Sequence, residues 1–371
     1  MAETGRAALF IDTGQPYEIR EIPLPEVEPD AILVRVTTAS ICGSDLHVWR
    51  GDIRVAMAGP GARIMGHEMV GRVYRLGANV STDSLGQPLK EGDRVIYPYF
   101  FPCRRCYQCL RGEFNCCPTR YPLPPIVDNF PHFTGAYAEY FYLPPGHFVF
   151  KAGEDLPDEM LAPINCALSE VTFGLHKVGI TFGDSVAIQG AGGLGINATM
   201  VAREMGASQI IVIDGIPERL ELTKACGADH VIDINETASS FERINRVKEF
   251  TDGRGADVVV EVVGVPDVIA EGLTMARAGG SYLEIGNITM GQVATLDPSQ
   301  WVWSNKRIVS VNMYDPWIMP VALDFLRRTR DKYPVHKVVS HKFPLEQINE
   351  AFQEAEWANK RTAVTRACIV P

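Results

Sequence analysis

The chain has 371 residues, of which 46% are hydrophobic, and a formal net charge of −10. This length exceeds what one hydrophobic core usually serves, so we expect two domains, or one domain interrupted by another. The acidic balance argues against nucleic acid and anionic membrane surfaces as partners, because binding to their phosphate groups draws on a concentrated positive field.

The compartment can be predicted from the cysteines and the apolar runs. The first ten residues lack the basic start and apolar stretch of a secretory signal, and no later run is long enough to span a bilayer. Four of the nine cysteines crowd into one spaced cluster, which in such a chain indicates metal binding rather than disulfides. We therefore expect a cytoplasmic protein with reduced thiols and no membrane partner.

The predicted elements change character along the chain. Residues 7–92 hold short runs rich in β-branched residues and punctuated by Gly, Pro and Asp, which predicts a β-rich unit with strands near 32–36 and 70–76. From residue 183 apolar strands alternate with helical stretches, as in βαβ units of a parallel sheet. The expected strands there are 185–189, 210–214, 257–263 and 280–285, and the expected helices are 196–205 and 217–226. After about residue 310 the pattern is mixed.

A glycine-rich motif follows the strand at 185–189. Gly190, Gly192, Gly193, Leu194 and Gly195 give G-x-G-x-x-G between that strand and a helix, where a tight turn lets a pyrophosphate approach the backbone.

Asp214 ends the next expected strand, where a carboxylate can accept hydrogen bonds from an adenosine ribose. It also repels a 2′-phosphate, which favours NAD over NADP, although Arg219 lies close by. The alternative is an aspartate that only caps the following turn.

Two sets of residues are candidates for zinc. Cys103, Cys106 and Cys109 stand at a spacing of three, and either Cys116 or Cys117 supplies a fourth thiolate, so this compact loop is typical of a closed structural site. The alternative is buried or disulfide-bonded cysteines.

Cys42, His67 and Cys166 form the second set and are dispersed along the chain. Cys42 opens Cys-Gly-Ser-Asp-Leu-His, and His67 lies in Gly-His-Glu between a turn and a strand. Three protein ligands leave one tetrahedral position for water or an alcohol oxygen, which is typical of a catalytic zinc.

With these motifs the chain resembles the zinc-containing medium-chain alcohol and polyol dehydrogenases. In that family the structural lobe follows C-x2-C-x2-C-x7-C, which fits Cys117 and sets Cys116 aside. The third catalytic ligand precedes the glycine motif by about two dozen residues, as Cys166 does. The resemblance implies a β-rich GroES-like catalytic domain interrupted by a doubly wound Rossmann domain. The limits would be 1–166 and 310–371, with a zinc lobe at about 99–118, and 167–309 for the NAD-binding domain.

The function implied by the resemblance is hydride transfer between an alcohol and NAD, giving a ketone or aldehyde and NADH. A secondary, cyclic or polyol-type alcohol is expected, and the family forms homodimers or homotetramers. Polyol-specialised members tend to carry Glu where this chain has Cys166, and some alcohol dehydrogenases carry a basic residue where it has Gly43. The alternatives are a threonine or polyol dehydrogenase, and a non-catalytic zinc- and nucleotide-binding protein on the same fold.

Four residues around the dispersed ligands are predicted to assist catalysis. Ser44 can accept the hydroxyl proton, which the resemblance sends through the nicotinamide ribose to His47 and solvent; the alternative for Ser44 is a helix N-cap. Asp45 is expected to accept a hydrogen bond from His67 and fix its tautomer. Glu68 is expected behind the zinc, with an occasional ligand role. The alternative for both acids is a solvated surface charge.

The remaining predicted site residues concern the pocket and the coenzyme. Tyr99 corresponds to a family position that lines the substrate pocket, and Arg366 resembles a family arginine that contacts the coenzyme pyrophosphate; the alternatives are a core aromatic and an exposed arginine. Val263, Ile285 and Gly286 end the later parallel strands, where ligands of open α/β sheets bind.

Overall fold

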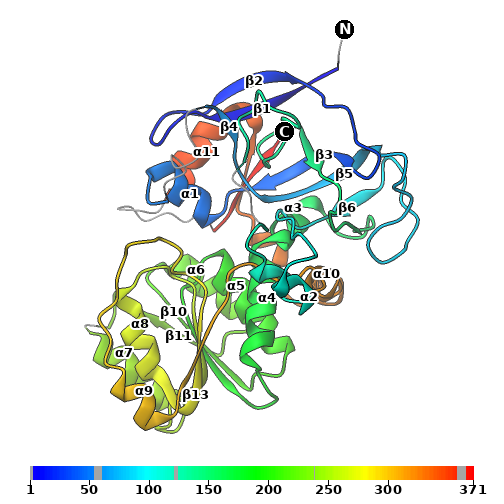
Figure 1. Ribbon diagram of the computed structural model, residues 1–371. Coiled ribbons are helices and arrows are strands. Elements are labelled where there is room, and N and C mark those ends of the chain that lie inside the picture. Colours follow the sequence, from blue (N-terminus) through cyan, green and yellow to red (C-terminus); the bar gives the residue numbers. More distant parts are fainter. Residues whose placement is uncertain (1–2, 54–60, 121–123, 238, 357–364) are drawn as a thin grey trace. The chain divides into compact units, whose positions relative to one another are not determined.

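A computed structural model of the protein describes most of the chain, and its fold is mixed α and β (Figure 1). The described residues are 3–53, 61–120, 124–237, 239–356 and 365–371.

The chain forms two compact units. Unit 1 comprises Met1–Cys166, Asp315–Arg328 and Val339–Pro371, and unit 2 comprises Ala167–Tyr314 and Thr329–Val338. The chain thus passes into unit 2 after Cys166 and returns to unit 1 after Tyr314. The sequence predicts an earlier end for the second domain, at residue 309. The short segment 329–338 also belongs to unit 2.

Unit 1 is built on two sheets, as expected for the β-rich part of the chain. In the smaller sheet β1 pairs antiparallel with β2 and β4; the larger sheet has the order β15-β16-β3-β5-β6-β8, and β7 also pairs with β3. The strands are β1 Thr4–Phe10, β2 Glu18–Pro23, β3 Ile32–Ser40, β4 Arg63–Ile64, β5 Glu68–Leu76, β6 Arg94–Ile96, β7 Tyr140–Leu143, β8 Phe150–Lys151, β15 His341–Pro344 and β16 Ala367–Val370.

Short helices connect these strands. They are α1 Gly43–Arg50, α2 Tyr107–Leu110, η2 Phe114–Cys116, α3 Asp158–Leu161, η3 Ala162–Asn165, α10 Ile318–Thr329, η5 Leu345–Gln347 and α11 Ile348–Ala355. The main core of the unit lies between the larger sheet and α11, where Val34, Met69 and Phe352 are buried together. The antiparallel pairing of β3 with β5 sets Ser40 opposite Glu68, so the segments that follow β3 and precede β5 lie side by side.

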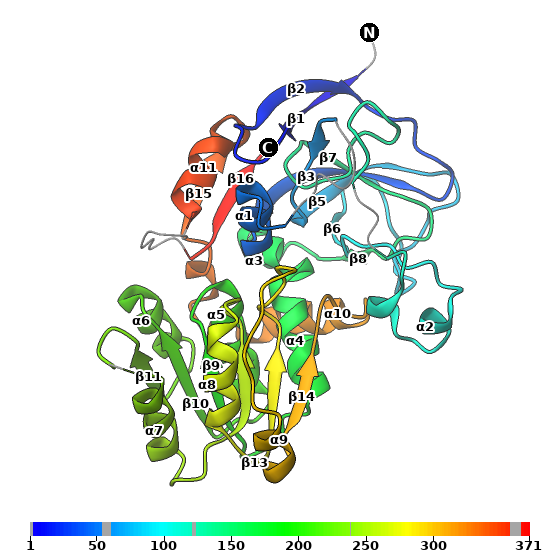
Figure 2. The ribbon, with the colours of Figure 1, turned by 60° about the vertical axis from the view of Figure 1, so that its left-hand side comes forward.

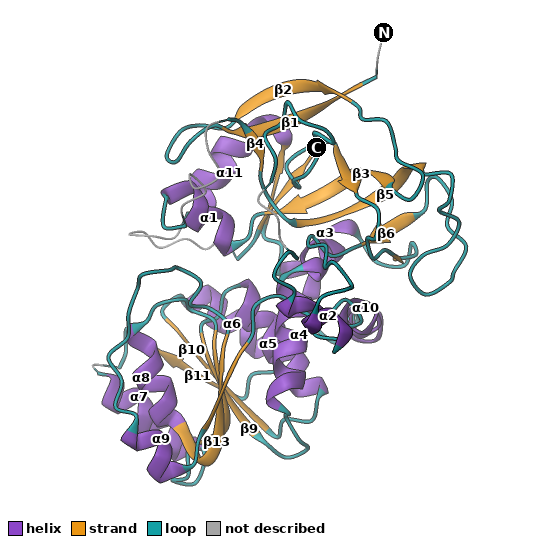
Figure 3. Cartoon of the chain, viewed as in Figure 1, coloured by secondary structure: helices purple, strands orange, loops and turns teal. Residues whose placement is uncertain are grey.

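Unit 2 is a parallel sheet with the order β11-β10-β9-β12-β13-β14, and Figure 2 shows its strands as neighbouring arrows. Helices cover both faces (Figure 3): α4, α5 and α6 pack on one face, and α7, α8 and α9 on the other. The strands are β9 Ser185–Gln189, β10 Gln209–Asp214, β11 His230–Asp233, β12 Ala256–Glu261, β13 Ala276–Glu284 and β14 Arg307–Ser310. The helices are α4 Ala167–Val178, α5 Gly193–Glu204, α6 Pro217–Ala225, α7 Ser240–Phe250, α8 Asp267–Met275, α9 Ser299–Ser304 and η4 Val335–Lys337.

The unbroken apolar runs explain this sheet. A strand covered on both faces must be apolar on both faces, and β9 and β10 are buried over almost their whole length. The doubly wound parallel sheet predicted from the alternation of strands and helices is therefore confirmed. In the described ranges, none of the helices has the length and apolar character needed to cross a bilayer.

Candidate functional site

The dispersed residues Cys42, His67 and Cys166 converge within unit 1. One ligand atom from each, together with a carboxylate oxygen of Glu68, lies within 4.8 Å of the others, and all four residues are buried. Two thiolates and an imidazole are ligands that zinc prefers. The donor set therefore fits a zinc ion.

Three local features bring these ligands together. Cys42 follows β3 and is the N-cap residue of α1, whereas His67 directly precedes β5, and β3 and β5 are paired. Cys166 comes from a distant segment, at the end of η3. The Asn165 side chain ties that segment to β5, because its Nδ2 donates to the His67 carbonyl over 2.9 Å and its Oδ1 accepts from Met69 N–H over 3.3 Å.

Asp45 lies next to His67. Its Oδ1 is 3.3 Å from His67 Nδ1, and its side chain is 5% exposed. Because Nδ1 faces the carboxylate, the Nε2 lone pair is left for a metal ion. A solvated surface charge, the alternative for Asp45, is therefore wrong.

Glu68 is fully buried, so the surface alternative is wrong for this residue too. Its Oε2 accepts hydrogen bonds from Ser40 Oγ and from Arg366 Nη1. Its Oε1 is buried without a hydrogen-bond partner among the described residues. This oxygen lies next to two thiols and an imidazole, and a buried carboxylate oxygen without a donor can be satisfied by a cation. Together with the donor set, it supports a metal ion at this site.

The electrostatics of this cluster favour the thiolate form of Cys42 but the protonated forms of His67 and Glu68, so a metal ion that binds here displaces a proton from His67. A hydrogen bond from Cys166, helped by His67 and Arg366, outweighs burial and holds the pKa of Cys42 well below its ordinary value. Burial opposes a charge on His67, but Asp45 and Cys42 outweigh it and raise the pKa of the imidazole well above its ordinary value. Burial raises the pKa of Glu68 to about 7, against the opposing effect of Arg366.

Ser44, His47 and Tyr99 also lie in unit 1. The N-cap of α1 is Cys42, so an N-cap role for Ser44 is wrong, and Ser44 is half-buried in the first turn. His47 lies one turn further along α1, and its Nδ1 is 2.8 Å from Asp52 Oδ2. The ring of Tyr99 packs against His67, with 4.6 Å between ring centroids.

The cysteine-rich lobe gathers four thiols. The Sγ atoms of Cys103, Cys106, Cys109 and Cys117 lie within 4.8 Å of one another, whereas Cys116 is exposed and is not part of this group. Cys103 N–H donates to Cys117 Sγ over 3.3 Å. All nine cysteines are free, so the disulfide alternative is wrong.

In unit 2 the glycine motif forms the turn between β9 and α5. Gly190 has a φ of +104°, and a Cβ at Gly195 would lie 1.9 Å from the Gly190 carbonyl oxygen, so both positions require glycine. A Cβ at Gly192 would enter open space beside the first turn of α5, which Gly193 and Leu194 begin and which lacks a side-chain cap. Open space at an uncapped helix N-terminus fits a phosphate-bearing ligand.

Asp214 ends β10 and contacts this turn. Its Oδ2 accepts from Ala191 N–H over 2.6 Å, and its Oδ1 accepts from the N–H groups of Gly215 and Ile216. The capping role considered as the alternative is thus present. A carboxylate has further lone pairs, so these contacts still allow a ribose hydroxyl to donate to it. Burial lowers the pKa of Arg219, and Asp214 opposes that effect.

Val263, Ile285 and Gly286 follow β12 and β13 at the carboxyl edge of the sheet. Val263 borders the glycine turn, since a Cβ at Gly190 would lie 3.2 Å from its side chain. Glu261, which the sequence analysis did not identify, holds both loops: its carboxylate accepts from the N–H groups of Val263, Gly264 and Gly286.

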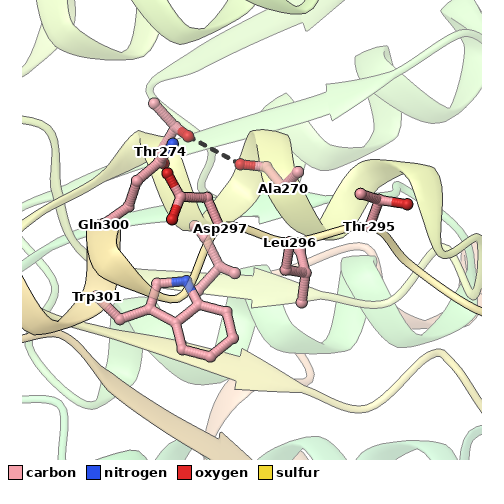
Figure 4. A pocket seen from close by; sticks show the side chains of 8 residues that line it. Ala270, Thr274, Thr295, Leu296, Asp297, Gln300 and Trp301 are labelled. Carbon is pink, nitrogen blue, oxygen red and sulfur yellow. Dashed lines mark hydrogen bonds between the residues drawn. The ribbon is translucent and has the colours of Figure 1, made fainter.

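A separate hollow of about 320 Å³ lies in unit 2 between α8 and α9, lined by residues including Asp297 and Trp301 (Figure 4). It contains none of the predicted coenzyme residues, and we assign it no function.

These two units define a class of protein: a nucleotide-binding oxidoreductase with a metal centre in a GroES-like domain. Comparison with known families agrees. Residues 28–154 match the alcohol dehydrogenase GroES-like domain, and residues 193–328 match the zinc-binding dehydrogenase domain.

Individual relatives cover nearly the whole chain. The 5-exo-hydroxycamphor dehydrogenase of Pseudomonas putida is 32% identical over 358 residues, 94% of each chain, and the erythritol/L-threitol dehydrogenase of Mycolicibacterium smegmatis is 31% identical over 348 residues, 90% of each. An alcohol dehydrogenase structure from Thermotoga maritima superposes with a TM-score of 0.91 at 28% identity, covering 100% of both chains. The chain belongs to the zinc-containing medium-chain alcohol dehydrogenase family. It is a zinc-dependent oxidoreductase that acts on CH–OH groups with a nicotinamide cofactor.

Proposed function

We propose that this enzyme oxidises a secondary, cyclic or polyol-type alcohol with NAD at a zinc centre held by Cys42, His67 and Cys166, giving a ketone or aldehyde and NADH. The observation that carries the proposal is the buried convergence of these three side chains with Glu68. A zinc ion bound there polarises the alcohol oxygen and lowers the pKa of its hydroxyl group.

The residues around the centre then have separate tasks. Ser44 Oγ would accept the hydroxyl proton and pass its own proton through the nicotinamide ribose to the His47 imidazole. His47 lies one helical turn away, is held by Asp52 and would release the proton to solvent. Asp45 orients His67. Glu68 is balanced by Arg366 and offers Oε1 as an occasional ligand. Tyr99, packed on the His67 ring, lines the substrate pocket.

For the coenzyme, we assign the pyrophosphate to the turn of Gly190, Gly192, Gly193, Leu194 and Gly195, and the adenosine ribose to Asp214. The uncapped start of α5 and the open space at Gly192 support this. The negative charge of Asp214 disfavours a 2′-phosphate despite the nearby Arg219, so we favour NAD. Val263, Ile285 and Gly286 frame the nicotinamide. From the family resemblance we also assign Arg366, which pairs with Glu68, to the pyrophosphate.

We infer a second, structural zinc in the lobe of Cys103, Cys106, Cys109 and Cys117. Four thiols in one group leave no position for a substrate, which is typical of a site that stabilises a loop.

The substrate class rests on relatives. By their names, one relative acts on 5-exo-hydroxycamphor and another on erythritol or L-threitol, which supports a hydroxyl on a cyclic or polyol skeleton. Another relative, 31% identical over 357 residues, is an L-threonine 3-dehydrogenase. L-threonine is therefore included among the test substrates.

Two further properties complete the proposal. Nine free cysteines support a reducing compartment such as the cytoplasm. A homodimer or homotetramer is inferred from the family resemblance, and it is compatible with four exposed apolar side chains in the segment between β13 and β14, because exposed apolar surface favours association. They are Met290, Val293, Val302 and Trp303.

The test is a spectrophotometric screen for NADH formation with primary, secondary, cyclic and poly-alcohols and L-threonine, repeated with NADP. We expect turnover with NAD on secondary or cyclic alcohols, and weaker NADH binding in Asp214→Ala. A protein that binds both zinc and NADH but turns over no alcohol in the panel would contradict the proposal and favour a non-catalytic binder.

A further inference from the structure

The carboxylate of Asp45 has a donor that no motif predicted. Tyr137 Oη donates to Asp45 Oδ2 over 2.7 Å, and the Cys42 N–H donates to the same oxygen over 2.9 Å. The other oxygen, Oδ1, faces His67 Nδ1. Tyr137 is fully buried in the core of unit 1, behind the metal centre.

We propose that Tyr137 is a positioning residue of the catalytic metal centre: its hydroxyl fixes the Asp45 carboxylate, which in turn orients the His67 imidazole toward the metal. The proposal rests on the zinc site assigned above. A carboxylate that orients a metal-bound histidine works through its own geometry, so a hydrogen bond that holds the carboxylate acts on the metal through two links.

The main chain of Tyr137 is fixed independently of its hydroxyl. Tyr137 N–H donates to the Met65 carbonyl over 3.1 Å, and Ala136 N–H donates to the Gly66 carbonyl over 3.0 Å. These bonds attach residues 136–137 to the segment just before His67. Replacing Tyr137 with Phe therefore keeps these main-chain hydrogen bonds and removes the hydroxyl alone.

The Tyr137 ring also shapes the turn before His67. Gly66 has a φ of +83°, and a Cβ at this position would lie 2.8 Å from the ring. The aromatic ring thus lies directly on the backbone that presents His67. Phenylalanine preserves this contact, which separates the effect of the ring from the effect of the hydrogen bond.

Burial, together with the charge of Asp45, raises the pKa of Tyr137 well above its ordinary value. The hydroxyl therefore stays protonated and remains a donor.

Tyr17 offers a matched control. It is buried in the same cluster and packs edge-on against Tyr137, with 6.2 Å between ring centroids. Its hydroxyl has no hydrogen-bond partner among the described residues. Tyr17→Phe and Tyr137→Phe thus delete the same group at the same depth, but only Tyr137→Phe removes a bond to Asp45.

The experiment measures zinc binding and the metal's ligand field in full-length wild type, Tyr137→Phe and Tyr17→Phe. Zinc affinity is determined by competition with a chelator. The absorption spectrum is recorded after cobalt replaces zinc at the catalytic site, which has an open position and should exchange its metal more readily than the closed structural site. We expect Tyr137→Phe to weaken zinc binding by about 10-fold and to shift the cobalt d–d bands. Loss of a residue that supports a metal ligand usually weakens metal binding by about 10- to 100-fold. We expect the lower end of this range because the Cys42 N–H still donates to Asp45. Tyr17→Phe should stay within about twofold of wild type by the same measure.

Three results would overturn the proposal. Two of them are unchanged affinity and spectrum in Tyr137→Phe and equal weakening in both variants. Loss of both metals from Tyr137→Phe would also overturn it, because that pattern indicates general unfolding. Failure of the wild-type protein to bind an exchangeable zinc would instead contradict the proposed function, so the two failures are distinguishable.

Discussion

The side-chain amide of Asn165 bridges two main-chain groups on either side of Glu68, donating to the His67 carbonyl and accepting from the Met69 N–H. Asn165 is fully buried, and Cys166 is the next residue. The amide thus substitutes for a strand partner at the start of β5. It fixes the third metal ligand beside the second, although the two come from distant parts of the chain.

Asn165→Leu tests this bridge. Leucine has a similar volume but leaves a carbonyl and an N–H buried without their partner, and each such group costs about 1–3 kcal/mol. We expect the free energy of unfolding to fall by about 2–6 kcal/mol and the catalytic zinc to be held more weakly. Urea unfolding and metal analysis measure both, with Asn79→Ala at an exposed position as the control. A wild-type urea midpoint with full zinc content would contradict the assignment.

The buried pair of Glu68 and Arg366 gives a second prediction. Their side chains are 0% and 5% exposed, so neither charge can be solvated when the other is removed. Arg366→Met should destabilise the protein by about 3–5 kcal/mol, since breaking a buried ion pair leaves one uncompensated charge.

The double variant Glu68→Gln/Arg366→Met separates the pair from its parts. Because it removes both charges, it should recover a large part of the stability lost in Arg366→Met, as measured by urea midpoints of the wild type, both single variants and the double variant. Simple additivity of the two single effects would show that the pair does not act as a unit.

These contacts also mark the limit of what the sequence could predict. The cysteine spacing and the glycine motif are local patterns, so the four-thiol lobe and the turn after β9 could be placed from them. The Glu68–Arg366 and Asn165–His67 contacts join residues 298 and 98 positions apart, and no spacing rule connects them. Arg366 was predicted as a coenzyme contact from resemblance, but its bond to Glu68 depends on how β16 pairs with β3.

The double role of Asp214 was likewise not predicted. The position of Asp214 at the end of a strand predicts either a ribose contact or a turn cap. In the structure its carboxylate caps the following turn and also accepts a hydrogen bond from Ala191 in the glycine loop. Such a contact depends on the register of β9 and β10, which the sequence does not specify.

The neighbouring cysteines of the lobe provide a matched test of the structural zinc. Cys117→Ser removes one of the four grouped thiols, whereas Cys116→Ser removes an exposed thiol outside the group. We expect Cys117→Ser to lose the firmly held zinc and to melt at a lower temperature, because binding of a structural zinc contributes directly to folding. Cys116→Ser should keep two zinc ions per chain. Equal zinc loss in both variants would exclude the assignment of Cys117.

In unit 2, a pair of carboxyl groups lies at the carboxyl edge of the sheet, where β12 ends at Glu261 and β13 at Glu284. Asn287 Nδ2 donates to both, over 2.9 Å to Glu261 Oε2 and 3.1 Å to Glu284 Oε1. Burial, together with the hydrogen bond and charge of Glu284, raises the pKa of Glu261 from 4.5 to about 8. The pair therefore retains a proton at pH values where an exposed glutamate has lost it.

This shift predicts how stability depends on pH. Below about pH 4.5 Glu261 is protonated in both the folded and unfolded states, so it does not make the free energy of unfolding depend on pH; between pH 4.5 and about 8 only the folded state keeps the proton. The folded state then binds more protons, so the free energy of unfolding falls as pH rises, by at most about 1.4 kcal/mol per pH unit, and levels off above pH 8.

Glu284→Gln removes the neighbouring charge and should lower the pKa of Glu261 toward its ordinary value, so this variant should lose less stability than the wild type over that range. Melting temperatures recorded at intervals across it measure the difference, with Glu236→Gln at an exposed position of the same unit as the control. Parallel melting curves for the wild type and Glu284→Gln would show that the two carboxyl groups titrate independently.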